Sequence, residues 1–365
     1  MIREFTYQAL PMRVLFGPGT SAMAGAELDA LGLRRGLVVC SPGHRALGEK
    51  VAAALGERSA GVLAEARMHV PAEVAAHASA QAARSGADST VAVGGGSAIG
   101  LAKAIALDLG LPIVAIPTTY AGSEMTPVWG LTGNSEKRTG RDLRVLPRSV
   151  IYDPELTLAM PRELSVTSAV NAFAHAAEAL YAPDLTPLIA IQAEEGARAI
   201  AAALPWIATP GADVAARSEA QYGAWLCGTC LGATTMSLHH KLCHVLGGLG
   251  LPHAPTHTVL LPYVLAFNAP SAPEAMAALG RALGGPADPA AELWRRTGGL
   301  GAPRSLAELG LDRAAIATAA DLAVRSAYPN PRPVTREDAE RLLTAAWSGA
   351  DPTTCADAPP QGDVR

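Results

Sequence analysis

Residues 90–107 read TVAVGGGSAIGLAKAIAL, and this stretch decides the fold class. The apolar run at 90–93 predicts a buried strand, three glycines follow, and the alanine- and leucine-rich remainder predicts a helix. Glycines let a backbone adopt positive φ and approach a ligand closely. We expect Ser97 to cap the helix, whose first N–H groups and positive dipole end suit phosphate. The predicted phosphate-binding residues are Gly94, Gly95, Gly96 and Ser97.

This turn is neither the G-x-G-x-x-G fingerprint nor a P-loop, so it gives no support for ATP hydrolysis. The alternative is a tight strand-to-helix turn that binds no ligand. The loop that follows the next predicted strand weighs against this alternative. The apolar run at 111–116 leads directly into PTTYAGSE, a hydroxyl-rich loop at 117–124. Ligands of open α/β sheets bind at the carboxyl ends of strands. The loop residues predicted to contact a cofactor are Thr118, Thr119, Tyr120 and Ser123.

The end of an earlier strand bears on which dinucleotide the chain uses. Residues 37–40 (LVVC) form an apolar run that ends in Cys40 and Ser41, where we expect the adenosine ribose to bind. A carboxylate at this place would favour NAD and repel the 2′-phosphate of NADP. None is evident, and His44 and Arg45 follow closely. Both NADH and NADPH are therefore predicted cofactors.

The distribution of patterns along the chain predicts two domains. Strand and helix patterns alternate over residues 1–157, which favours a parallel sheet with crossover helices that forms an α/β dinucleotide-binding domain. Residues 158–350 consist of long alanine- and leucine-rich windows, including one at 212–235, and predict an all-α catalytic domain. The proline-rich, polar residues 351–365 predict a flexible tail.

Composition limits the classes of partner. The chain has 365 residues, 49% hydrophobic and 17% charged, with a net charge of −4, so a basic nucleic-acid-binding surface is not expected. It contains no charge-free apolar run of about twenty residues and no signal-peptide pattern at its start, so we expect a soluble, cytoplasmic protein without a membrane partner. Cys227 and Cys230 form a C-x-x-C pair inside a run of small apolar residues, which favours close helix packing over redox chemistry.

Histidines are concentrated in the predicted helical domain. Asn171 and His175 stand four positions apart, as do His240 and His244, so each pair shares one face of a helix. His253 follows a glycine-rich bend and a proline. A lone histidine on an apolar helix is usually a satisfied core residue, but several buried polar groups are kept mainly where they pair or act.

Two functional interpretations of these histidines remain open. Imidazoles at i and i+4 suit zinc or iron coordination, and three histidines can hold catalytic zinc unaided. The neutral amide of Asn171 is a weaker ligand than a carboxylate, which leaves acid–base chemistry without a metal as the other interpretation.

Taken together, these motifs resemble the iron-containing alcohol dehydrogenase superfamily, whose fold is shared with dehydroquinate synthase and glycerol dehydrogenase. The resemblance rests on GGGS at 94–97, PTTYAGSE at 117–124, NAFAHAAEA at 171–179, and HKLCH with the later PH at 240–253. It extends from about residue 14 to about 348. Within the superfamily, the details are similar to the maleylacetate reductases.

The resemblance implies roles for particular residues. In metal-dependent members an Asp and three His bind the metal, and the matching positions are Asn171, His175, His240 and His253. His244 matches the histidine that stands beside the nicotinamide and handles protons. The change from Asp to Asn is typical of maleylacetate reductases, which are held to work without metal, so the resemblance implies a metal-independent enzyme. It also implies a homodimer.

The implied reaction is NAD(P)H-dependent reduction of the C=C bond of maleylacetate, or a related unsaturated oxo acid, to 3-oxoadipate. The small-molecule partner is then a dicarboxylate, for which Lys241 and Arg332 are the first candidate cations, with Arg138 and Arg141 next; each could instead be a surface charge. The alternatives are a metal-dependent alcohol dehydrogenase or aldehyde reductase of the same superfamily, a dehydroquinate-synthase-like cyclase, and a non-catalytic cofactor-binding protein.

Overall fold

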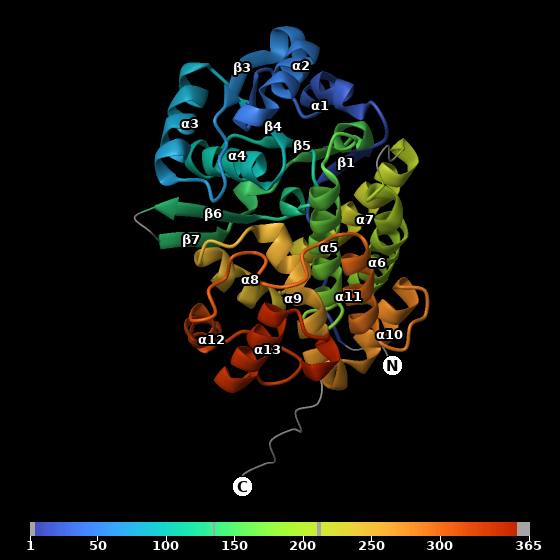
Figure 1. Cartoon of the computed structure of the whole chain (residues 1–365). Coiled ribbons are helices and arrows are strands. Elements are labelled where there is room, and N and C mark those ends of the chain that lie inside the picture. Colours follow the sequence, from blue (N-terminus) through green and yellow to red (C-terminus); the bar gives the residue numbers. More distant parts are fainter. Residues whose placement is uncertain (1–3, 134–135, 210–212, 356–365) are drawn as a thin grey trace. The chain divides into compact units, whose positions relative to one another are not determined.

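The computed structural model describes residues 4–133, 136–209 and 213–355, and the chain divides into two compact units (Figure 1). The first, an α/β unit, comprises Tyr7–Pro161 and Thr209–Ala233. The second, a helical unit, comprises the described residues of Met1–Thr6, Arg162–Ala208 and Thr234–Arg365. An α/β part and a helical part were both predicted, and this fold class is confirmed.

A six-stranded parallel sheet forms the centre of the α/β unit, with the strands in the order β1-β8-β5-β4-β2-β3. The chain leaves β2 for β3 on one side, whereas it leaves β4 for β5 on the other, so the topological switch point lies between β2 and β4. The strands are β1 (Arg13–Phe16), β2 (Gly36–Cys40), β3 (Ser59–Ala64), β4 (Ser89–Gly94), β5 (Ile113–Pro117) and β8 (Ser149–Tyr152).

Helices cover both faces of this sheet, which explains why its central strands are apolar on both sides. Leu37 and Val39 of β2 pack with helices on one face, and Val38 and Cys40 pack with helices on the other. The first face carries α3 (Ala72–Arg84) and α4 (Gly96–Leu109), and the second carries α1 (Ala24–Ala30) and α2 (Arg45–Leu55).

Two parts of the α/β unit differ from the prediction. The segment 128–141 forms an antiparallel hairpin of β6 (Val128–Gly133) and β7 (Glu136–Arg141), which was not predicted. Helix α7 (Val214–Ala233), expected within the helical half, belongs to the α/β unit. It does so because Trp225 packs on the sheet, and because Gly228 leaves no room for a Cβ beside Met125.

The remaining helices form the helical unit. Helix α5 is buried along almost its whole length and packs against α6 and α9, and α8 packs against α9. The helices are α5 (Arg162–Ala179), α6 (Pro187–Ile207), α8 (Leu238–Gly248), α9 (His253–Asn268), α10 (Pro273–Ala282), α11 (Pro289–Gly299), α12 (Ala315–Val324) and α13 (Arg336–Ser348).

The predicted tail does not begin at residue 351. Residues Pro352–Cys355 form a 3₁₀ turn in which Pro352 and Cys355 are buried, because apolar side chains anchor this segment. The rest of the predicted tail, 356–365, lies outside the described residues. Within the parts of the chain that the structure describes, no helix is both long and apolar enough to span a membrane.

Candidate active site

The glycine turn closes β4 with the backbone geometry that only glycine adopts readily. Gly94 has φ +141°, and a Cβ there would lie 3.1 Å from the Cβ of Ala98. Ser97 is not the N-cap as predicted, because α4 begins at Gly96 and Gly95 occupies the cap position in extended conformation. Gly96 is exposed, and a Cβ there would meet nothing within 4 Å. The first N–H groups of α4 therefore open onto accessible space.

The predicted hydroxyl-rich loop lies directly beside this turn. The backbone N–H of Thr118 donates to the carbonyl of Gly94 at 3.2 Å, and a Cβ on Gly95 would touch the side chain of Thr119 at 3.0 Å. The parallel pairing of β4 and β5 brings their carboxyl ends to the same edge of the sheet. Turn and loop therefore lie side by side at the carboxyl edge of the sheet, where α/β sheets bind ligands.

Tyr120 and Ser123, also predicted to contact the cofactor, are placed differently by the structure. Tyr120 is fully buried, and its hydroxyl accepts a hydrogen bond from the guanidinium of Arg217 at 3.3 Å. The carbonyl of Ser123 accepts a hydrogen bond from Lys103 at 2.7 Å. These two residues therefore hold the loop inside the unit.

Lys103 was not singled out from the sequence, although it is a charged residue buried inside the α/β unit. Its side chain is only 1% exposed. The ammonium group donates to the carbonyls of Ser123, Thr126 and Val128 at 2.7–2.8 Å, and to the hydroxyl of Thr126 at 3.0 Å. Burial lowers the pKa of Lys103 to about 7. We call Lys103 and these acceptors the lysine cage; it ties α4 to the hydroxyl-rich loop.

At the end of β2, Cys40 and Ser41 also make contacts within the protein. Cys40 is fully buried, and a Cβ on Gly48 of α2 would lie 2.8 Å from its sulfur, so this side chain fills the core. The Ser41 hydroxyl lies 2.9 Å from Nδ1 of His44. No carboxylate occupies residues 41–45.

In the helical unit, the predicted imidazoles come together from three helices. The rings of His175 on α5 and His240 on α8 lie 5.2 Å apart, and His244 lies 6.3 Å from His240. His253 on α9 contacts His257, with a ring separation of 4.4 Å, and His257 lies 5.0 Å from His240. His175, His240 and His257 are buried, whereas His244 and His253 are exposed. We call these residues, with Asn171 and His239, the histidine cluster.

Several polar atoms of the histidine cluster have no hydrogen-bond partner within the described part of the chain. Asn171 is 1% exposed, and among the described residues its Oδ1 has no hydrogen-bond partner. The same holds for Nδ1 of His175 and Nε2 of His240. Buried polar atoms are nearly always satisfied, so such a group indicates a place for a ligand, water or ion.

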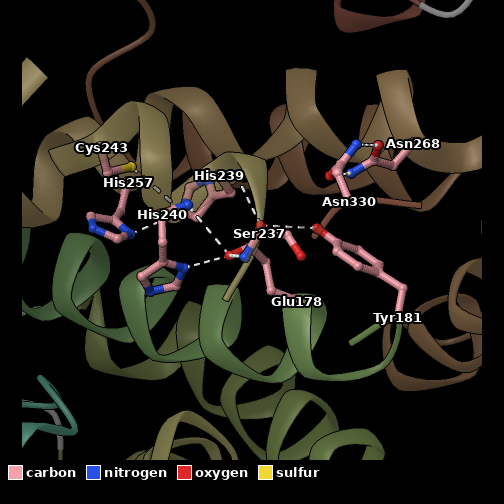
Figure 2. A network of polar contacts seen from close by, with 9 residues as sticks. All are labelled: Glu178, Tyr181, Ser237, His239, His240, Cys243, His257, Asn268 and Asn330. Atoms are coloured by element: carbon pink, nitrogen blue, oxygen red, sulfur yellow. Dashed lines mark hydrogen bonds and ion pairs between the residues drawn. The ribbon is translucent and has the colours of Figure 1, made fainter. Parts of the chain in front are cut away.

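A buried carboxylate, Glu178, contacts the cluster at His240 (Figure 2). Glu178 is one turn along α5 from His175 and fully buried. Its Oε2 lies 2.6 Å from Nδ1 of His240, and its oxygens accept the backbone N–H groups of Ser237, His239 and His240. Glu178 was not among the predicted site residues, although a charged residue within an alanine-rich helical stretch is a signal that the sequence shows.

Two further histidines were also missed. Nε2 of His239 lies 2.9 Å from Nδ1 of His257, and the sulfur of Cys243 lies 3.7 Å from the same His239 nitrogen (Figure 2). These three residues have the spacing of a metal site. However, burial raises the pKa of the Cys243 thiol well above its usual range, which disfavours the thiolate, and the imidazole–imidazole hydrogen bond accounts for the pair without an ion.

Burial also sets the charge of the cluster. It lowers the pKa of His175, His239 and His257 well below the usual 6.5, and repulsion from neighbouring imidazoles acts in the same direction. These rings are therefore neutral at pH 7. Neutral imidazoles can bind metal ions or exchange hydrogen bonds with a substrate.

Of the candidate cations, Arg332 and Lys241 belong to the helical unit, and Arg138 and Arg141 belong to the α/β unit. Arg332 donates to the carbonyl of Phe267 at 3.2 Å and lies over its ring. Phe267 is fourteen residues from His253 along α9, or about 21 Å at 1.5 Å per residue, so Arg332 lies far from that imidazole. Lys241 neighbours His240 on α8, but its ammonium donates to Ser326 at 2.9 Å. In the α/β unit, Arg141 donates to the carbonyl of Gly232, and Arg138 is exposed.

Two family models match nearly the whole chain. Residues 11–154 match the iron-containing alcohol dehydrogenase model, and residues 165–347 match the model of the carboxyl-terminal part of the Fe-containing alcohol dehydrogenase family.

Individual relatives match over the same extent. A maleylacetate reductase from Burkholderia cepacia is 54% identical, covering 96% of this chain and 100% of that protein. The crystal structure of maleylacetate reductase from Agrobacterium tumefaciens superposes with a TM-score of 0.92 at 48% identity, covering 96% and 100%. The crystal structure of an iron-containing alcohol dehydrogenase from Corynebacterium glutamicum has a TM-score of 0.92 at 45% identity, covering 97% and 99%.

Proposed function

The chain belongs to the iron-containing alcohol dehydrogenase family, and we propose that it reduces the C=C bond of maleylacetate to 3-oxoadipate with NADH or NADPH. The observation that carries this proposal is the histidine cluster with its unpartnered buried atoms. At the family's metal-binding positions, the chain keeps three imidazoles and has the neutral amide of Asn171 where a carboxylate is found in metal-dependent members. Relatives at about half identity are named maleylacetate reductases.

The reaction sets three chemical requirements. A hydride adds to the alkene carbon β to the ketone, and the π electrons move onto the ketone oxygen to give an enolate. A proton then adds to the α carbon, which restores the ketone and leaves oxidised nicotinamide. The protein must orient the substrate, stabilise the enolate oxygen and supply the proton.

The residues of the cluster suit the last two requirements. The amide of Asn171 and the imidazole of His175 lie one turn apart on α5, and the His175 ring lies 5.2 Å from the His240 ring on α8. An N–H group of Asn171 or His175 can donate to the enolate oxygen. Hydrogen-bond donors fixed in a region that excludes water stabilise a developing oxyanion strongly. His244 is exposed beside His240, and we propose that it delivers the proton to the α carbon. His253, exposed beside His257, would contact the substrate from α9.

For the cofactor, the glycine turn fits a dinucleotide diphosphate. The open space at Gly96, the positive φ of Gly94 and the N-terminus of α4 make a cradle that a Cβ would disturb. Thr118 and Thr119 lie beside this cradle. When bound, the reduced nicotinamide supplies the hydride. Since residues 41–45 carry no carboxylate, we propose that NADH and NADPH both serve.

We also propose that no metal is required. A divalent ion in the family polarises the substrate oxygen, and here His175, His240 and His253 with Asn171 would hold it. That set carries no negative charge, because the amide of Asn171 stands where metal-dependent members have a carboxylate. The same three imidazoles keep a metal-dependent alcohol dehydrogenase or aldehyde reductase as the second candidate.

The proposal extends to the group that binds the substrate's carboxylates, the class of partner, the oligomeric state and the cell compartment. The substrate's carboxylates need cations, and Lys241 on α8 is our remaining candidate, since Arg332 contacts Phe267 far along α9 from His253. The absence of a strongly basic charge balance supports a small-molecule substrate over nucleic acid. We propose a cytoplasmic homodimer that acts in the catabolism of aromatic compounds, in line with the family resemblance.

The test is oxidation of NADH and NADPH, followed by absorbance, with maleylacetate and separately with simple aldehydes. Mass spectrometry of the product should identify 3-oxoadipate, with one equivalent of cofactor consumed. We expect turnover with maleylacetate and both cofactors, and little with aldehydes. Efficient aldehyde reduction without consumption of maleylacetate would instead support the alcohol dehydrogenase alternative.

A further inference from the structure

Glu178 is a buried carboxylate whose every recorded contact is with a hydrogen-bond donor. Three backbone N–H groups reach it, from Ser237, His239 and His240, at 2.8–3.3 Å. The hydroxyl of Tyr181 donates to Oε1 at 3.4 Å (Figure 2). With so many N–H groups directed at it, the carboxyl group is an acceptor on both oxygens. The fifth contact, 2.6 Å from Nδ1 of His240, must then also be a donor contact.

The hydrogen on Nδ1 fixes the orientation of the His240 ring. The two nitrogens of an imidazole point in different directions, so a ring whose Nδ1 donates to Glu178 directs Nε2 away from that carboxylate. Nε2 of His240 is the buried atom that lacks a partner among the described residues. It is the atom available to a ligand.

The same carboxylate also fixes the backbone that carries the ring. The side chain of Ser237, the residue that precedes α8, makes no capping hydrogen bond, and Glu178 from α5 accepts the first N–H groups of α8 in its place. A negative charge at a helix N-terminus is also favourable to the helix dipole. Main chain and side chain of His240 are thus held by one group.

We propose that Glu178 is a positioning residue of this site: it holds His240 through both its backbone and Nδ1, so that Nε2 is the nitrogen left to contact the ligand. The inference deepens the proposed function and rests on it for the identity of that ligand. Partners that hold a metal-binding imidazole in this way typically change affinity or activity by about 10–100-fold when they are removed, and we expect a similar loss for His240.

The first readout is the tautomer of His240, measured by long-range ¹H–¹⁵N NMR on protein labelled in its histidines. The His240 signals are assigned by their loss in His240→Asn. We expect the hydrogen on Nδ1 in the wild-type protein. In Glu178→Gln the amide group can donate to Nδ1, so the hydrogen should move to Nε2. Wild-type protein with Nδ1 unprotonated would overturn the proposal, even if the variant failed to fold.

The second readout separates positioning from stability. With maleylacetate, kcat of Glu178→Gln should fall by about 10–100-fold, while KM for NADH stays unchanged. The matched control is Leu246→Ala, which removes a fully buried side chain from the same helix without touching His240. It should lower Tm but keep the wild-type tautomer and kcat. Tyr181→Phe, which removes one contact with Oε1 of Glu178, should also keep the wild-type tautomer of His240 and the wild-type kcat.

A purely structural role would give a different pattern. Glu178→Gln would then keep the tautomer of His240 and lose no more activity than Leu246→Ala, which would refute the positioning role. If wild-type protein failed to reduce maleylacetate, the proposed function would fall, whereas the NMR result would still decide whether Glu178 orients His240.

Discussion

The lysine cage of the α/β unit and the histidine cluster of the helical unit both bury polar groups, but they satisfy them differently. In the cage, the single ammonium of Lys103 is surrounded by four acceptors from Ser123, Thr126 and Val128. In the cluster, Oδ1 of Asn171, Nδ1 of His175 and Nε2 of His240 have no partner among the described residues.

This difference in hydrogen bonding distinguishes buried polar groups that serve stability from buried polar groups that serve function. An unpaired buried polar atom costs about 1–3 kcal/mol, so a group that is fully paired can be kept for stability alone. A buried polar atom without a partner lowers stability, and a ligand that forms a hydrogen bond with it can offset that loss. We therefore assign the cage to holding the loop beside the glycine turn, and the cluster to binding and protonating the substrate.

The largest expected effect is on activity and comes from the cluster. His244→Ala should lower kcat by about 10²–10⁴-fold, because positioned proton donors contribute that much. The fold should be unchanged, since His244 is exposed. Steady-state kinetics and circular dichroism measure the two effects. His77→Ala, an exposed histidine of the α/β unit, is the matched control and should keep full activity. A near-normal kcat in the His244 variant would remove this residue from the mechanism.

The cage predicts the opposite pattern. Lys103→Met should lower the free energy of unfolding by at least about 1–3 kcal/mol, the cost of leaving one buried acceptor unpaired, because it removes the donor of four buried acceptors. Urea denaturation measures this change, and we expect a raised KM for NADH as the loop loosens. Lys241→Met serves as the comparison, because Lys241 is only partly buried and makes one hydrogen bond to Ser326. If Lys103→Met lowered the free energy of unfolding no more than Lys241→Met does, the cage would not stabilise the fold.

The dependence of stability on pH should also separate the two regions, with an acid window for the cluster and an alkaline window for the cage. His175, His239 and His257 have a folded pKa below 6.5, so the unfolded chain binds more protons at acid pH. Stability should therefore fall as pH drops below about 6.5, by up to ~1.4 kcal/mol per pH unit for each ring. Urea unfolding between pH 5 and 7.5 tests this, and His257→Gln should show a shallower fall.

Lys103 acts in the alkaline window. Its folded pKa of about 7 lies below its ordinary 10.5, so between these values the unfolded chain again binds more protons. Stability should rise with pH across that window, and Lys103→Met should lack this rise. An identical pH profile in the wild-type protein and the Lys103 variant would contradict the assignment.

Some of this architecture was predictable because its signals are local. Buried apolar runs such as 90–93, followed by glycines, predict strands and the turn after them. The position of α7 was not predictable, because its small residues indicate close packing but not the partner surface. The N-cap was misjudged at Ser97, because a glycine backbone started the helix two residues earlier.

For the candidate site, helical spacing revealed which histidines share a face, but not which helices meet. His239 and His257 were missed because their hydrogen bond joins α8 and α9, a contact that no single helix pattern contains. Glu178 was missed for the same reason. Arg332 was overvalued, because sequence alone does not show that it lies over Phe267 near the far end of α9.

The most direct test of the central claim is the rate at which exhaustively chelated protein oxidises NADH with maleylacetate, with its metal content verified by elemental analysis. Imidazoles and the amide of Asn171 act without an ion in our account, so the metal-free protein should keep its full rate. A rate that collapses on chelation and returns with added Fe²⁺ or Zn²⁺ would contradict it.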